Sequence, residues 1–211
     1  MKYLICIIIG YALGSIPTAY LVLRKVHGID ITNTGTGNMG AMNSFEITNS
    51  KVIGILVLLI DALKGLLSVY IPVLLFHGDF GYPAIGLISA VFSHCYNPWL
   101  LFKGGRGLAT SLGGTILLFP FLPLIWMLIW AIIYIIKKDI LLANIWAIIL
   151  SFIVVISANE IGYYYSFPRA DSMSSLMLFT SSLLILIFIK HIEPFIEIIN
   201  KLKREKDAQQ I

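Results

Sequence analysis

Long apolar runs separated by short polar segments dominate the chain. A helix needs about 20 apolar residues to cross a bilayer, and runs close to that length cover 3–23, 52–76, 82–102, 140–160 and 173–190. A further stretch, 108–136, contains Pro120 and Pro123. As one helix it would be too long for the bilayer and broken at both prolines, so the alternative is a hairpin of two short limbs. The pattern predicts an all-α, polytopic membrane helical bundle, with residues 1–211 in a single domain.

The distribution of positive charge decides between one span and two in 108–136. With two limbs the chain has seven spans, and most cations fall on one side of the membrane. That side carries Arg24, Lys25, Lys51, Lys103, Arg106, Lys137, Lys138, Lys190, Lys201, Lys203, Arg204 and Lys206, whereas Lys2 and Arg169 lie opposite and Lys64 lies within a span. Because Lys and Arg concentrate in cytoplasmic loops, we expect seven transmembrane helices with the N-terminus outside and the C-terminus in the cytoplasm. An alternative to a first transmembrane helix is that the first apolar run is a cleaved signal peptide, but no small-residue cleavage site follows it.

The composition excludes several classes of protein. Hydrophobic residues make up 58% of the chain and charged residues 12%, and the mean hydropathy is +0.90. Soluble domains carry about 25% charged residues, so a soluble globular enzyme, a disordered chain and a nucleic-acid-binding module are excluded. Cys6 and Cys95 lie in apolar runs and do not suggest a disulfide framework.

A glycine-rich polar loop follows the first span. Gly35, Gly37 and Gly40 match the spacing of a dinucleotide fingerprint, but no strand precedes them, so that interpretation is weak. Freed backbone N–H groups, together with side chains such as those of Thr36, Asn38 and Asn43, instead favour an anion cradle. The alternative is a tightly packed polar turn.

A second glycine-rich segment, 102–111, connects two spans on the same expected face. Gly104 and Gly105 lie between the cations Lys103 and Arg106, and Gly107 follows Arg106. The following helix directs its N-terminus, with its hydroxyl side chains, to the same place. Dipole, donors and charge together predict a phosphate site, and a tight turn facing lipid headgroups is the alternative.

Polar residues at membrane depth form the third group of candidates. Asp61 and Lys64 are spaced to neutralise each other on one helix face. His94 precedes the second glycine segment, and Ser15 precedes the kink expected at Pro17. For each of these residues a structural role and a role in a site both remain open. The chain lacks the HExxH, CxxC and nucleophile-elbow patterns, so a metalloenzyme or a covalent enzyme is unsupported.

Taken in order, these segments resemble the acyl-phosphate:glycerol-3-phosphate acyltransferases of bacteria, the PlsY family. The elements that carry the resemblance are Gly14–Pro17, Gly35–Asn43, Asp61–Gly65 and the segment from His94 to Thr110. The resemblance covers about residues 10–111, half of the chain.

This resemblance implies a seven-helix fold in the bacterial cell membrane with the site on the cytoplasmic side. Members of the family transfer a fatty acyl group from acyl phosphate to the sn-1 hydroxyl of glycerol 3-phosphate. The products are lysophosphatidic acid, a phospholipid precursor, and phosphate. The resemblance implies acyl phosphate, glycerol 3-phosphate and membrane lipid as partners, with no cofactor, metal or nucleic acid.

Three features depart from the family pattern. Thr32 stands where the family has an arginine, and Arg106 stands where it has a lysine, which keeps the charge but changes the hydrogen-bond geometry. In the last motif, which begins at His191, Pro194 replaces an asparagine and Glu197 a basic residue. Altered substrate, reduced activity and a non-catalytic paralogue therefore remain alternatives, as does a small anion transporter.

From motifs and resemblance together we expect the catalytic residues Arg106, His191 and Asn38. The expected substrate-binding residues are Ser15, Thr36, Gly37, Asn43, Lys64, His94, Lys103, Gly104, Gly105, Gly107 and Thr110. The hypothesis is that the two glycine turns hold phosphate and stabilise charge on the leaving phosphate and the carbonyl oxygen. The proton acceptor is either His191 or a substrate phosphate oxygen.

Overall fold

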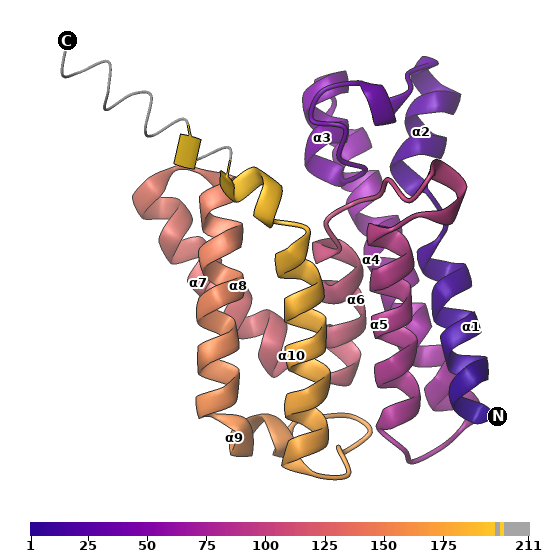
Figure 1. Cartoon of the computed structure of the whole chain (residues 1–211), viewed down its shortest axis with the longest axis vertical. Coiled ribbons are helices and arrows are strands. Elements are labelled where there is room, and N and C mark those ends of the chain that lie inside the picture. Colours follow the sequence, from indigo (N-terminus) through magenta and orange to yellow (C-terminus); the bar gives the residue numbers. More distant parts are fainter. Residues whose placement is uncertain (197–198, 201–211) are drawn as a thin grey trace.

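The computed structural model describes residues 1–196, 199 and 200, and this part of the chain contains helices and no strand (Figure 1). The α-helices are α1 (Lys2–Gly14), α2 (Thr18–His27), α3 (Ala41–Thr48), α4 (Lys51–Leu75), α5 (Gly81–Cys95), α6 (Leu108–Leu118), α7 (Phe121–Lys137), α8 (Ile140–Ser157), α9 (Asn159–Tyr164) and α10 (Met173–Ile189). Two short 3₁₀ helices, Ile31–Asn33 and Pro98–Leu100, lie in the loops. Glu197 and the charged tail from Lys201 onward lie outside the described residues.

The segment 108–136 forms two helices, as the hairpin interpretation predicts. The break falls between Leu118 and Phe121, at Pro120. Pro123 does not break a helix, because it lies in the first turn of α7, where a proline removes no intrahelical hydrogen bond.

Two other predicted spans are shorter than the apolar pattern suggests. The run 3–23 is divided into α1 and α2 at Pro17, because proline disfavours helical geometry in the preceding residue. Two side chains compensate for the break: Lys64 Nζ donates to the Ile16 carbonyl at 3.1 Å, and Asn97 Nδ2 donates to the Ser15 carbonyl at 2.8 Å. The run 82–102 is α-helical only to Cys95, and the short 3₁₀ helix Pro98–Leu100 follows.

By length and composition, three helical segments of the described chain suit a membrane crossing: Lys2–His27, Lys51–Leu75 and Ile140–Ser157. Shorter apolar helices cover Leu108–Leu118, Phe121–Lys137 and Met173–Ile189. Large apolar side chains are exposed on the outside of the bundle while a charged one is buried inside it: Val52 is 75% exposed and Leu178 71% exposed, whereas Asp61 is only 1% exposed. Such a distribution is typical of a bundle surrounded by lipid.

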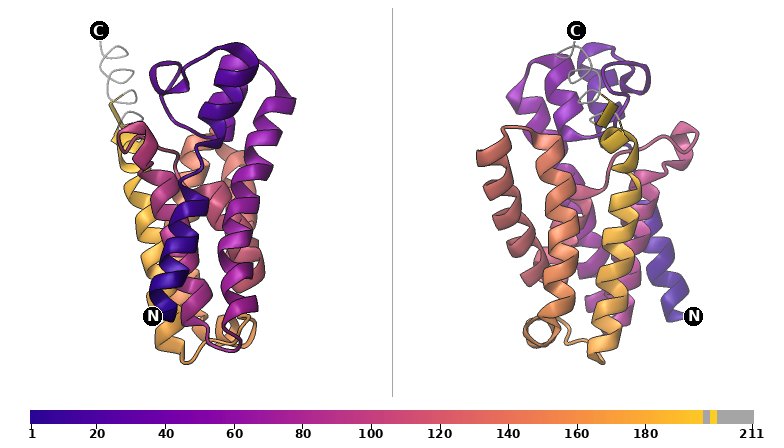
Figure 2. Two further views of the ribbon diagram at one scale, coloured as in Figure 1. Left: turned by 90° about the vertical axis from the view of Figure 1, so that its right-hand side faces the viewer. Right: turned by 60° about the vertical axis from the view of Figure 1, so that its left-hand side comes forward.

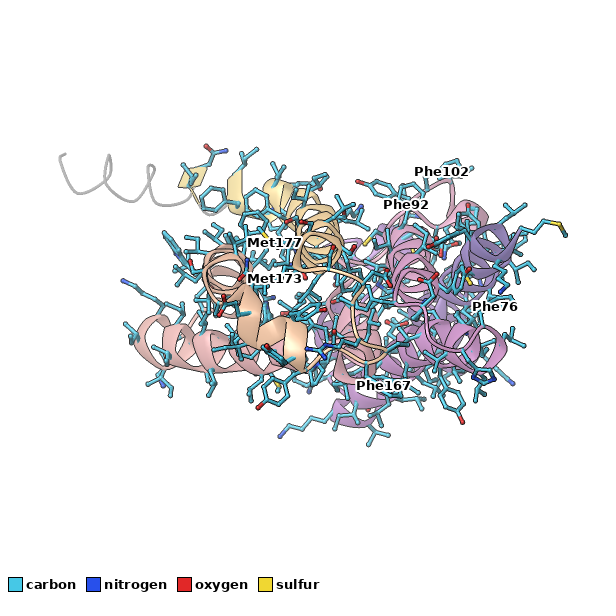
Figure 3. The ribbon with its side chains drawn as sticks, turned by 90° about the horizontal axis from the view of Figure 1, so that it is seen from below. Phe76, Phe92, Phe102, Phe167, Met173 and Met177 are labelled. Carbon is cyan, nitrogen blue, oxygen red and sulfur yellow. The ribbon has the colours of Figure 1, made fainter. Side chains whose placement is uncertain are left out.

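The helices form a bundle with an elongated cross-section (Figure 3), and the exposed aromatic residues Phe92 and Phe102 lie on one outer edge of it. Residues 28–50 and 96–107 gather at one end, which we call the motif end (Figures 1 and 2). The ends of α2, α7 and α10 lie there too, so most of the cations share this end, whereas the N-terminus and the α9–α10 connection lie at the other. A buried cluster under the first loop joins it to α2 and α4 through Ala19, Leu23, Ile31, Met39, Ile53 and Val57.

Candidate active site

A buried asparagine fixes the first glycine loop. Asn43, in the first turn of α3 and 2% exposed, accepts a hydrogen bond from the Thr36 N–H at 3.1 Å through its Oδ1 atom. Its Nδ2 donates to the Asn38 carbonyl at 2.9 Å and to the Thr34 carbonyl at 3.4 Å. The loop is therefore closed around one amide side chain, and its backbone does not depend on a ligand for its shape.

The start of the same loop is stabilised by an aspartate. Asp30 Oδ1 accepts hydrogen bonds from the hydroxyl of Thr32 at 2.7 Å and from its N–H at 3.0 Å. These bonds from Thr32, the side-chain bond first, lower the pKa of the Asp30 carboxyl. Asp30 thus caps the short 3₁₀ helix Ile31–Asn33, and Thr32, which stands at the position of the family's arginine, donates to this cap.

The second glycine segment packs directly on α5. The Gly105 N–H donates to the His94 carbonyl at 3.0 Å. A Cβ at Gly104 would collide with that carbonyl, and one at Gly105 would collide with His94 Nε2. Gly107, with φ +83°, precedes α6 in a left-handed conformation that favours glycine. The glycines therefore let the backbone turn tightly against α5 and begin α6.

The two glycine segments meet. The Met39 N–H lies 3.5 Å from the Gly104 carbonyl, and a cavity of about 560 Å³ is lined by Asn38 from the first loop and by Arg106 and Gly107 from the second. The lining also includes Leu108 and Ala109, at the N-terminus of α6, where backbone N–H groups have no partner within the helix. A cation and a helix N-terminus thus border the same cavity, which suits an anion.

A buried ion pair lies beside this cavity. Asp61 Oδ1 is 2.9 Å from Lys64 Nζ and 3.8 Å from His94 Nδ1. Asp61 and His94 line the cavity, whereas Lys64 is turned to the Ile16 carbonyl. The pair therefore connects the α1–α2 break to the wall of the site.

The cavity continues as an apolar groove between α7, α8 and α10. Its lining there includes Trp126 and Trp130 from α7, Asn144 from α8 and Leu184 from α10. The volume lies within the range of about 300–1,000 Å³ typical of ligand sites. One cavity therefore combines an anion-binding end with an apolar end.

Comparison with known proteins assigns the family. A family model described as glycerol-3-phosphate acyltransferase matches residues 4–201. The chain belongs to the glycerol-3-phosphate acyltransferase family. A glycerol-3-phosphate acyltransferase of Wolbachia pipientis subsp. Culex pipiens is 33% identical over 190 residues, which cover 90% of this chain and 91% of the relative. One from Helicobacter acinonychis is 35% identical over 129 residues, and the match spans only 58% of each protein.

Solved structures of the family share the fold. The crystal structure of PlsY, an integral membrane glycerol 3-phosphate acyltransferase, in its glycerol 3-phosphate form superposes with a TM-score of 0.79 and 28% identity, covering 95% of this chain and 94% of PlsY. The lysophosphatidic acid form gives a TM-score of 0.77 and 29% identity, covering 95% and 93% of the two chains. The chain therefore has the all-helical fold of an integral membrane protein.

The expected acyltransferase site residues fall into three groups. The cavity is lined by Asn38, His94, Arg106 and Gly107. Residues that shape the adjoining turns without lining it are Thr36, Gly37, Asn43, Gly104 and Gly105. The remaining ones lie elsewhere: Ser15 and Lys64 at the α1–α2 break, Lys103 on the exposed surface, Thr110 packed on Gly65, and His191 buried beyond α10.

His191 is held as a neutral imidazole. Its Nδ1 lies 2.8 Å from the Ile187 carbonyl, and because a carbonyl only accepts, Nδ1 carries the proton. The pKa of His191 is lowered to about 4, mainly because the imidazole is buried; the hydrogen bond to the Ile187 carbonyl opposes this shift, and the nearby positive charge of Arg106 adds to it. Nε2 is buried and without a hydrogen-bond partner in the described part of the chain.

The sequence prediction missed the apolar end of the cavity. Trp126 and Trp130 line it at a spacing of four residues, which places them on one face of α7. That spacing was a usable signal, and so was Asn144, a polar residue inside an apolar run. In the described residues no group of three or more His, Cys, Asp or Glu side chains is arranged to hold a metal ion.

Proposed function

We propose that this protein transfers a fatty acyl group from acyl phosphate to the sn-1 hydroxyl of glycerol 3-phosphate, giving lysophosphatidic acid and phosphate. The observation that carries the proposal is the single cavity that joins an anion-binding end to an apolar groove. Both substrates are phosphates and need the anion-binding end. The acyl phosphate donor and the lysophosphatidic acid product also carry an acyl chain, so these two molecules need the apolar groove as well. PlsY, which shares the fold, has a glycerol 3-phosphate form and a lysophosphatidic acid form.

The anion-binding end supplies electrostatic stabilisation. Arg106 and the backbone N–H groups at the start of α6 stabilise charge on the leaving phosphate and on the carbonyl oxygen, while Asn38 orients the acceptor. Loss of one such donor typically raises the barrier by ~2.7–4 kcal/mol. Holding the acceptor hydroxyl against the acyl carbonyl lowers the reaction barrier by up to ~7–11 kcal/mol. An acyl phosphate is already an activated anhydride, so no protein nucleophile is required.

In the transfer step the acceptor hydroxyl oxygen forms a bond to the acyl carbonyl carbon. The bond from that carbon to the phosphate oxygen breaks, and the phosphate leaves with the electron pair. The hydroxyl proton passes to a phosphate oxygen, because a histidine with a pKa of about 4 is a weak base near neutral pH. His191 then has a structural role, tied to the end of α10.

Purified protein with acyl phosphate and glycerol 3-phosphate tests the proposal. Phosphate and lysophosphatidic acid should form in equal amounts. Arg106→Glu should lower kcat/KM by about 1,000-fold or more, since it removes a donor and introduces repulsion. Arg106→Lys should retain part of the activity because the charge is kept. Lys137→Glu, a charge reversal at an exposed residue at the end of α7, is the matched control and should act like wild type.

Other outcomes would favour the alternatives. Binding of acyl phosphate with no phosphate release would indicate a non-catalytic paralogue. Flux of phosphate esters across sealed vesicles, without product in detergent, would indicate a transporter.

We also propose seven transmembrane spans in the bacterial cell membrane, with the motif end in the cytoplasm. The cations at the ends of α2, α7 and α10 support this orientation. Both native cysteines are buried, so a single introduced cysteine can report its side of the membrane. An impermeant maleimide added to intact cells should label Asp171→Cys, and should label Lys138→Cys only after permeabilisation. The reverse pattern would contradict the orientation.

A further inference from the structure

The connection between α5 and α6 carries exposed apolar side chains. Trp99, Leu101 and Phe102 are 72%, 88% and 63% exposed, and Lys103, which follows them, is also exposed. Leu100, by contrast, packs against the buried cluster under the first loop. We call residues 99–102 the apolar loop. Large apolar side chains gathered on a surface in this way mark a contact with another molecule or with a membrane.

A buried asparagine holds the apolar loop in shape. Asn97 Oδ1 accepts a hydrogen bond from the Trp99 N–H at 3.1 Å, and the Asn97 carbonyl accepts one from the Phe102 N–H at 2.8 Å. The Nδ2 atom of Asn97 donates to the Ser15 carbonyl at the α1–α2 break. Leu101 and Phe102 have φ angles of +53° and +60°, a left-handed conformation that is strained for residues other than glycine. Strain of this kind persists only where the surroundings fix the backbone, so the exposure of the loop is built into its structure.

The direction of this connection suits a membrane surface. In the right-hand view of Figure 2 the segment between α5 and α6 extends sideways from the bundle, below the level of α2 and α3. A membrane crossed by the helices has its surface in this same sideways direction. Residues 96–107 include the cations Lys103 and Arg106 and no acidic residue. Aromatic side chains next to cations are typical of the boundary between lipid headgroups and acyl chains.

The outer surface of α1 continues onto the apolar loop. Trp99 lines a groove of about 460 Å³ together with residues of α1 and the break after it, among them Ile8, Tyr11 and Ile16. α1 lies in the segment Lys2–His27, which is long and apolar enough to cross a membrane, and Ile8 is 58% exposed. Lipid chains that contact this face of α1 therefore reach the indole of Trp99 as well.

We propose that the apolar loop inserts into the bilayer at the motif end, with Trp99, Leu101 and Phe102 at the boundary between headgroups and acyl chains. The partner is the phospholipid of the surrounding membrane. Its acyl chains cover the exposed apolar side chains, and its phosphates match the positive charge of Lys103. The inference does not depend on the acyl transfer proposed above. Because the loop continues directly into Gly104, its insertion also fixes the second glycine segment relative to the membrane surface.

Tryptophan fluorescence of the full chain in vesicles tests the insertion. The vesicles contain phosphatidylcholine and phosphatidylglycerol, with bromine on the lipid chain either near the headgroup or near the chain end. The signal of Trp99 is the difference between wild type and Trp99→Phe. Bromine near the headgroup should quench this difference signal at least about twofold more strongly than bromine near the chain end, as expected for an interfacial indole. Quenching by aqueous iodide, with none by brominated lipid, would overturn the inference.

A second measurement keeps the inference testable if Trp99→Phe does not fold. Both native cysteines are buried, so Leu101→Cys can carry a polarity-sensitive dye. In vesicles the emission of this dye should shift to shorter wavelength and be quenched by brominated lipid. The matched control is His27→Cys, which is also exposed but lies at the end of α2, and its dye should emit as in water without such quenching. Equal emission from the two positions would contradict the insertion.

The dye at Leu101→Cys also distinguishes lipid from a second copy of this chain. If lipid covers the apolar loop, the emission should stay constant as the protein is diluted with additional lipid. A shift to longer wavelength on dilution, without quenching by brominated lipid, would assign the surface to a contact between copies and overturn the inference.

Discussion

The two halves of the bundle are held together by different means. In the half that carries the glycine segments, helix backbones touch: a Cβ at Gly10 would collide with the Gly86 carbonyl on α5, and one at Gly65 with the Thr110 carbonyl on α6. In the other half α7 and α8 are joined by a hydrogen bond between side chains, from Trp130 to Asn144 at 2.8 Å.

This difference matches the demands of the proposed reaction. The phosphate groups and the carbonyl need donors held within a few tenths of an ångström, and direct backbone packing leaves little freedom for α4, α5 and α6. An acyl chain needs only an apolar surface of suitable length, which side chains on α7 can provide. We therefore expect that substitutions in the first half abolish activity and that those in the second half change specificity or stability.

The largest effect should follow from adding side-chain volume between α4 and α6. Gly65→Val, and to a lesser degree Gly65→Ala, must push the helices apart, because the new Cβ meets backbone rather than a movable side chain. We expect a loss of stability of about 3 kcal/mol and a fall in kcat/KM of about 100-fold or more as Arg106 moves with α6. Thermal unfolding in detergent and phosphate release measure both quantities.

Ala12→Val adds volume to the exposed face of α1 and should change neither stability nor activity. Wild-type melting and turnover in Gly65→Ala would show that the close approach of α4 and α6 is unimportant.

A smaller effect is expected when the first loop loses its central amide. Asn43→Ala removes the acceptor for the Thr36 N–H and the donor to the Asn38 carbonyl. The loop should remain anchored through Ile31 and Met39, so Tm should change little while kcat/KM falls about 10-fold to 100-fold. Asn33→Ala, an exposed asparagine of the same loop, is the control. A fall in Tm without a fall in kcat/KM would assign Asn43 to stability alone.

The sequence predicted the part of the site that depends on local chemistry. Gly104, Gly105 and Arg106 are adjacent in the chain, so their role in one turn could be recognised without knowing the fold. The hairpin in 108–136 was predictable from charge, because the bilayer forces every span to end on a definite side.

The partners of Lys64 and the apolar end of the cavity were not predictable in the same way. Lys64 donates to the carbonyl of Ile16, at a helix break 48 positions earlier in the chain. The spacing of Asp61 and Lys64 predicts their ion pair but not this hydrogen bond. The four-residue spacing of Trp126 and Trp130 indicates a shared face of α7, but which neighbours that face meets depends on the direction in which α7 leaves α6, and apolar periodicity cannot supply that direction in a helix that is apolar on every side.

Stability should also depend on pH through His191, at the junction of the two halves. The folded protein keeps this imidazole neutral with a pKa of about 4, whereas the unfolded chain binds a proton near the ordinary value of about 6.5. Stability should therefore be constant above about pH 7, fall as the pH drops through about 6.5, and level off near about 4. Between about pH 7.5 and about pH 5 the loss amounts to about 2 kcal/mol.

Melting curves of wild type and His191→Gln at these two pH values measure this effect. The variant keeps a donor for the Ile187 carbonyl but has no titrating group, so its Tm should vary less with pH. An equal pH dependence in both proteins would show that other groups control stability in this range.

The smallest effect concerns the turn between α7 and α8. Asp139 caps α8, since its Oδ1 accepts a hydrogen bond from the Leu142 N–H at 2.9 Å. Asp139→Ala should cost about 1 kcal/mol of stability, and Asp139→Ser should restore most of it because serine also caps helices. Neither variant should change kcat/KM for palmitoyl phosphate by more than about twofold, because the turn lies outside the cavity lining and the bond between Trp130 and Asn144 still joins the two helices. A large loss of activity in Asp139→Ala with normal stability would mean that α7 and α8 position the reacting groups as strictly as the glycine-packed helices do, and the contrast between the two halves would no longer hold.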